Sequence, residues 1–93
     1  MKLTIDVALA IIKELEDYFS SLEFIEGYAY HHEEEYINML CEHKGDKAFQ
    51  KVHAQLARFL IEHKDELRIL KMPRKGSVNV FGNITEVQFW QKK

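Results

Sequence analysis

Two histidines stand directly before three glutamates, from His31 to Glu35, and both side-chain types bind metal ions. On a helix, His31 and Glu35 would lie one turn apart, and His32 would also lie near Glu35. A closed site needs further ligands, which His53 or His63 would have to supply from another helix. The alternative is a solvated helix start, where carboxylates interact favourably with the helix dipole. We expect this alternative, with no metal and no cofactor.

The single cysteine, Cys41, could form a thiolate pair with a histidine such as His43, His53 or His63. Nucleophilic catalysis would also need an oriented base and a group that stabilises the oxyanion, and the sequence indicates neither. A lone cysteine on an apolar helix face is by default a small buried hydrophobic residue. We therefore expect no catalytic residue and no enzymatic activity. One cysteine cannot form an internal disulfide, which fits a reducing cytoplasm.

Positive charge gathers in the second half of the chain and could neutralise the phosphates of a nucleic acid. The cluster comprises Lys64, Arg68, Lys71, Arg74 and Lys75, and Lys92 and Lys93 follow the predicted hairpin. Asp65 and Glu66 interrupt the cluster and weaken its field. Three helices followed by a hairpin also resemble a winged-helix layout, in which Pro73 to Ser77 would form the wing. The alternative function is therefore a nucleic-acid-binding regulator that uses Arg68, Lys71, Arg74 and Lys75.

An apolar group on the predicted C-terminal hairpin is the preferred candidate for a protein contact. Residues 77–91 are rich in strand formers, and Gly82-Asn83 suits a two-residue turn that pairs Phe81 with Ile84 and Val78 with Val87. The predicted core face holds Val78, Val80, Thr85, Val87 and Phe89, and the opposite face exposes Phe81, Ile84 and Trp90. Exposed apolar clusters mark interfaces, so Phe81, Ile84 and Trp90 are the predicted partner-binding residues. The competing interpretation is that the monomer covers both sheet faces.

Three helices are predicted ahead of this hairpin. The first runs from about Ile5 to Glu23, with Thr4 as its cap. Its first turns are apolar nearly all round, and it continues with a stripe of Ile12, Leu15, Phe19 and Leu22. A helix that is apolar on most sides lies centrally or packs against a second subunit.

Gly27 is the first predicted break, after which a second helix begins between Tyr28 and His31 and runs to Glu42. Gly45 suits a left-handed cap after this helix. The third helix is capped by Asp46 and continues to about Leu70, because Pro73 disfavours helical geometry at the preceding residue. A competing interpretation ends it near His63 and makes Leu67 to Met72 a strand.

The predicted fold is a single α+β domain over residues 1–93, with three helices followed by a C-terminal antiparallel hairpin or a small three-stranded sheet. The composition, 46% hydrophobic and 30% charged, is that of an ordinary globular protein. The longest apolar run, Val7 to Ile12, spans six residues and is too short to cross a bilayer. We therefore expect a cytoplasmic protein with no membrane partner.

Charge is distributed unevenly along the chain. Met1 to His43 contain ten carboxylates and two lysines, a formal charge of −8. Lys44 to Lys93 contain eleven Lys or Arg and five carboxylates, a formal charge of +6. Such asymmetry indicates where a protein meets a partner or a second copy of itself. Small chains gain buried area by oligomerising, so we expect a homodimer. The predicted function is a non-enzymatic protein–protein interaction module, such as a small inhibitor, immunity or regulatory protein, with an unidentified protein partner.

Overall fold

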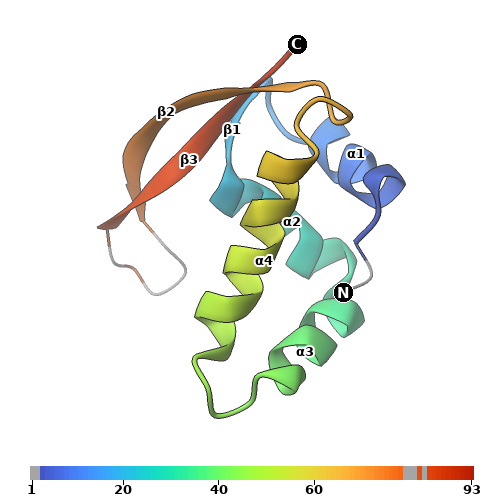
Figure 1. Ribbon diagram of the computed structural model, residues 1–93, viewed down its shortest axis with the longest axis vertical. Coiled ribbons are helices and arrows are strands. Elements are labelled where there is room, and N and C mark those ends of the chain that lie inside the picture. Colours follow the sequence, from blue (N-terminus) through green and yellow to red (C-terminus); the bar gives the residue numbers. More distant parts are fainter. Residues whose placement is uncertain (1–2, 79–81, 83) are drawn as a thin grey trace.

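The computed structural model describes residues 3–78, 82 and 84–93, and in these ranges it confirms the α+β class (Figure 1). The elements are α1 (Ile5–Lys13), β1 (Tyr18–Ser20), α2 (Ser21–His31), α3 (Glu33–Glu42), α4 (Ala48–Glu62), β2 (Ile69–Val78) and β3 (Ile84–Lys92). The strands form an antiparallel sheet in the order β1-β3-β2, so the last strand lies in the middle. Within the described ranges, no helix is both long enough and apolar enough to cross a bilayer.

The predicted first helix, Ile5 to Glu23, is wrong, because this segment contains α1, β1 and the start of α2. Thr4 caps α1 as expected, its hydroxyl accepting a hydrogen bond from the Val7 N–H at 3.2 Å. Ser20 begins a new helix: its hydroxyl accepts from the Glu23 N–H, and the Glu23 carboxylate accepts from the Ser20 N–H, both at 3.1 Å. This reciprocal capping box satisfies backbone donors at the start of α2, so the chain turns here and begins a second helix.

Gly27 lies inside α2, so the predicted helix break at this residue is wrong. A Cβ atom at this position would lie 2.9 Å from Ile11 Cγ2, and the missing side chain lets α1 pack closely on α2. The predicted second helix covers the end of α2 and all of α3, which meet at His32 with φ −129° and ψ 51°. Its predicted end at Glu42 is confirmed, and Gly45 adopts the expected left-handed conformation with φ 81°.

The long third helix is also wrong, and the competing interpretation, a shorter helix followed by a strand, is correct. Helix α4 ends at Glu62, a turn follows, and β2 begins at Ile69. Leu67 and Ile69 are buried in the core. Ile69 also pairs with Lys92 of β3, and a residue in a continued helix could not form this strand pairing. Asp46 does not cap α4, because Lys47 occupies the N-cap position and the Asp46 carboxylate pairs with Lys51.

The hairpin has a different register from the predicted one. Val78 pairs with Ile84 and Lys75 pairs with Val87, and the ladder is irregular between Met72 and Lys75. The predicted pairing of Val78 with Val87 is therefore wrong. The predicted positions of Asn79, Val80 and Phe81 lie outside the described residues. Because side chains alternate between the two faces of a strand, such a difference exchanges the core face and the outer face.

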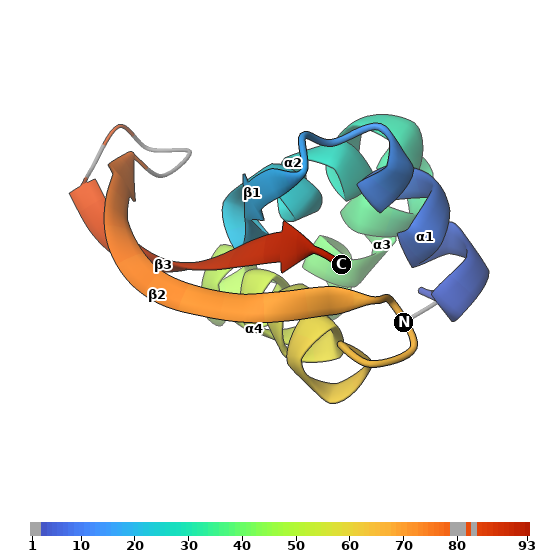
Figure 2. The same cartoon turned by 90° about the horizontal axis from the view of Figure 1, so that it is seen from above.

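The core lies between the sheet and the helices. Its largest fully buried side chains are Trp90, Tyr28, Phe19, Phe24, Leu56, Leu60, Ile69 and Val52. Trp90 is 0% exposed and lies directly opposite Phe19 of β1, so its predicted outward position is wrong. Figure 2 shows β2 and β3 as a curved ribbon whose far end projects away from the helices.

Candidate functional site

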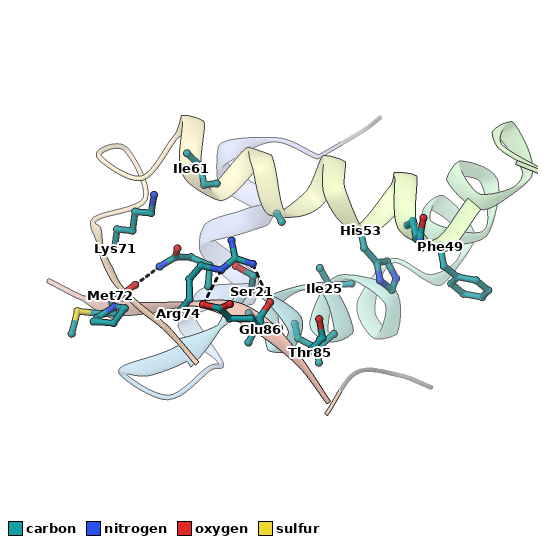
Figure 3. A pocket seen from close by; sticks show the side chains of 16 residues that line it. Ser21, Ile25, Phe49, His53, Ile61, Lys71, Met72, Arg74, Thr85 and Glu86 are labelled. Atoms are coloured by element: carbon teal, nitrogen blue, oxygen red, sulfur yellow. Dashed lines mark hydrogen bonds and ion pairs between the residues drawn. The ribbon is translucent and has the colours of Figure 1, made fainter. Parts of the chain in front are cut away.

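A groove of about 800 Å³ opens between α4, the first turns of α2 and the β2–β3 hairpin (Figure 3). Ser21, Leu22 and Ile25 line it from α2, and Phe49, Gln50, His53, Ala57 and Ile61 line it from α4. The hairpin contributes Lys71, Met72, Pro73 and Arg74 from β2 and Thr85, Glu86, Val87 and Gln88 from β3. Segments far apart in the sequence thus build one concave surface.

Helix α4 carries two apolar stripes. Val52, Leu56, Phe59 and Leu60 are buried in the core. Phe49, His53, Ala57 and Ile61 recur every fourth residue and line the groove. Residues four apart lie on the same face of a helix, so this second stripe follows the length of α4. Phe49 and Ile61 stay exposed, which gives the groove an apolar wall.

Hydrogen bonds donated by polar side chains hold the groove walls together. The Trp90 indole N–H donates to the Ser21 hydroxyl at 2.9 Å and joins β3 to α2. The Gln88 side-chain amide donates to the carbonyl of Met72 in β2 and to that of Phe89 at 2.8 Å. Ser21 and Gln88 therefore hold the strands and α2 in position.

Two cationic side chains reach the groove from β2. The Arg74 guanidinium donates to the Glu86 carbonyl at 3.0 Å, and its Nε lies 3.9 Å from the Glu86 carboxylate. Lys71 forms no ion pair with any residue in the described part of the chain. Because Glu86 balances Arg74, the groove keeps one uncompensated positive charge at Lys71.

His53 is the only histidine among the described groove residues, and its ring faces Tyr36 of α3. Its Nε2 lies 2.7 Å from the Tyr36 hydroxyl, and burial lowers the pKa of His53 while burial raises the pKa of Tyr36. Both shifts favour the neutral forms, so the pair acts as a neutral hydrogen bond between α3 and α4.

Cys41, the candidate nucleophile, is exposed on α3 and does not line the groove, and its predicted burial is wrong.

The four candidate nucleic-acid contacts lie on three parts of the surface. Lys71 and Arg74 line the groove. Lys75 lies on the other face of the sheet, where its Nζ is 5.1 Å from the centroid of the Tyr18 ring and 5.8 Å from that of Phe89. Arg68 lines a second hollow of about 390 Å³ together with Lys13, Lys92 and Lys93. The residues predicted as a wing, Pro73 to Ser77, lie within β2, so that assignment is wrong.

The predicted partner-binding residues do not form one surface patch in the part of the chain that the structure describes. Ile84 is exposed at the start of β3, Trp90 is buried in the core, and Phe81 lies outside the described ranges. The groove residues Phe49 and Ile61 were not singled out from the sequence as contacts. The signal that could have found them is the repeat of Phe49, His53, Ala57 and Ile61 beside the core stripe.

The histidines of the segment from His31 to Glu35 make separate contacts. His31 Nε2 lies 2.8 Å from the Glu14 carboxylate, and the His32 ring stacks on Tyr28 with centroids 5.4 Å apart. His63 pairs with Glu66 at 2.9 Å. Across the described residues, no group of three or more His, Cys, Asp or Glu side chains is placed to hold a metal ion.

The chain matches no protein-family model, no curated protein and no solved structure. The geometry of the groove is therefore the basis on which a function is proposed.

Proposed function

We propose that the protein is a non-enzymatic protein–protein interaction module and that the groove binds an apolar segment of its protein partner. The observation that carries this proposal is the second stripe of α4, which lines a concave surface with Phe49 and Ile61 exposed and Ala57 half-buried, while another stripe builds the core. Covering apolar surface stabilises a complex by about 25 cal/mol per Å² removed from water. A partner that presents apolar side chains should therefore form the most stable complex with the groove.

The polar groups of the groove support binding more than catalysis. Ser21, Gln88 and Arg74 are used in hydrogen bonds that connect the walls, and His53 is bonded to Tyr36. A catalytic site would place an oriented base next to a nucleophile and a group that stabilises developing charge. A concave surface whose polar groups are mostly used in internal hydrogen bonds is typical of a site that recognises shape and apolar contact.

The charge of the groove indicates what else the partner carries. Lys71 contributes a positive charge that no described carboxylate pairs with. Charged groups at the rim of an interface act mainly on association rate and on the choice of partner. We infer that the partner segment combines apolar side chains with a nearby carboxylate. A small inhibitor, immunity or regulatory protein in the cytoplasm would act in this way.

A library of random peptides displayed on phage and selected on the wild-type protein tests the groove. The selected peptides should combine Leu, Ile or Phe with Asp or Glu, and calorimetry should show at least about tenfold weaker binding to Ile61→Lys. Leu70→Lys is the matched control, because Leu70 is 47% exposed and Ile61 is 45% exposed, but Leu70 does not line the groove. Peptides that bind both variants equally well would contradict the proposal.

A further inference from the structure

We propose that the protein partner of the groove is a second copy of this chain, which inserts an exposed ridge of its helix α3. The ridge consists of Ile37 and Cys41, which lie one turn apart and are both exposed, Ile37 to 46%. Glu33, Glu34 and Glu42 flank it and are exposed as well. This inference rests on the proposed function, because it requires the groove to be a protein-binding site.

Helix α3 has the two properties expected of the partner segment, which are exposed apolar side chains and nearby carboxylates. It contains four carboxylates and neither Lys nor Arg, and its exposed apolar residues lie between those carboxylates. The three glutamates of the first turn interact favourably with the helix dipole. Glu42 lies in the last turn, where the helix dipole disfavours an anion, so the helix does not stabilise this carboxylate. A neighbouring cation would stabilise it.

The charge asymmetry of the chain is not neutralised within one molecule by the ion pairs between described residues. His31 with Glu14 lies within the −8 half, whereas Lys51 with Asp46, Lys64 with Asp65, His63 with Glu66 and Arg74 with Glu86 lie within the +6 half. Within the described ranges, Glu33, Glu34, Glu42 and Lys71 take part in no ion pair. The carboxylates that flank the ridge in one copy can therefore pair with Lys71 in the groove of a second copy.

The arrangement in space allows the contact to form twice. Figure 1 shows α4 between α3 and the β2–β3 hairpin, so the helix that carries the ridge is separate from the elements that form the groove. Where the ridge and the groove both face the partner across a twofold axis, each ridge enters the groove of the other copy and the contact forms twice. Ile37 would then contact the α4 wall at Ile61, with Glu34 near Lys71.

Charge reversal tests this contact through the exchange of partners. Glu34→Lys and Lys71→Glu each place like charges in both contacts of a dimer, and the dissociation constant should rise at least about tenfold in sedimentation velocity. In an equimolar mixture, the reversed ridge of one variant meets the reversed groove of the other, and the two unaltered surfaces meet as well. The mixture should therefore regain the dimer. Lys13→Glu, the same charge change outside the groove, should dimerise like the wild type.

The results distinguish this inference from the proposed function. A wild-type protein that stays monomeric, while selected peptides still bind the groove, would refute the second copy as partner and leave the groove as a protein-binding site. A dimer that neither charge reversal weakens would place self-association elsewhere and would also refute the inference. Loss of dimer in each variant without recovery in the mixture would show that Glu34 and Lys71 do not face each other. Circular dichroism of every variant confirms that the fold is retained.

Discussion

Replacement of Trp90 should destabilise the fold and should not act through an exposed surface. The indole is 0% exposed, lies opposite Phe19 and donates a hydrogen bond to the Ser21 hydroxyl at 2.9 Å. Truncation of a buried aromatic side chain costs about 3–5 kcal/mol. A domain of this size has about 5–15 kcal/mol of stability in total. Trp90→Ala should therefore remove a large part of the free energy of unfolding.

A double-mutant cycle separates the hydrogen bond of Trp90 from its packing. Trp90→Phe keeps an aromatic ring but removes the donor, and Ser21→Ala removes the acceptor. A net hydrogen bond contributes about 1 kcal/mol, and each single variant also leaves the other polar group buried and unpaired. The double variant should therefore be more stable than the sum of the two single losses predicts, by about 1 kcal/mol.

Urea unfolding followed by far-ultraviolet circular dichroism is the suitable assay, because Trp90 is the single tryptophan and its removal abolishes tryptophan fluorescence. Tyr30→Ala is the control, since Tyr30 is 81% exposed and its loss should change stability by less than about 0.5 kcal/mol. The reasoning is refuted if Trp90→Ala keeps the stability of the wild type and only weakens self-association. Additive losses in the cycle would refute the hydrogen bond to Ser21.

Two further predictions concern the start of α2 and the wall of the groove. Ser20→Ala should lower the urea-unfolding free energy by about 1 kcal/mol because it removes the cap of α2, whereas Ser20→Asp keeps an acceptor and should stay near the wild type; equal stability of all three proteins would argue against the capping box. Burial lowers the pKa of His53 from its usual 6.5, so the unfolded chain binds more protons than the folded one as pH falls below that value. The stability advantage of the wild type over His53→Gln should therefore shrink from neutral pH down through the folded pKa, and a difference that does not vary with pH would contradict this.

Local signals in the sequence predict several helix ends but not the break at Ser20. Ile12, Leu15, Phe19 and Leu22 follow helical spacing, and this pattern continues through a turn, a strand and a second helix. Spacing alone cannot separate these elements, because each contributes an apolar residue at the same interval whether or not the chain stays helical. The Ser-x-x-Glu pattern from Ser20 to Glu23 was the better signal, since it marks where backbone donors at a helix start are satisfied.

The candidate site could be predicted only in part. The cationic residues Lys71 and Arg74 are visible in the sequence, but their separation from Arg68 and Lys75 follows from the turn before β2 and from the two faces of the sheet. The apolar wall of α4 is visible as a second stripe. How far this wall is exposed depends on where the hairpin lies, because the hairpin forms the facing wall of the groove.

The sequence by itself determined the α+β class, the cap at Thr4, the end of α3 at Glu42, the last strand, β3, and the uneven charge. Only the tertiary structure decided which face of β3 is buried. Side chains alternate along a strand, so burial depends on register, and the register of β3 depends on its neighbours. One neighbour, β1, is about 70 positions away along the chain, since Phe19 of β1 lies opposite Trp90 of β3. A contact between such distant segments forms only in the folded chain, which is why Trp90 belongs to the core and the groove lies beside α4.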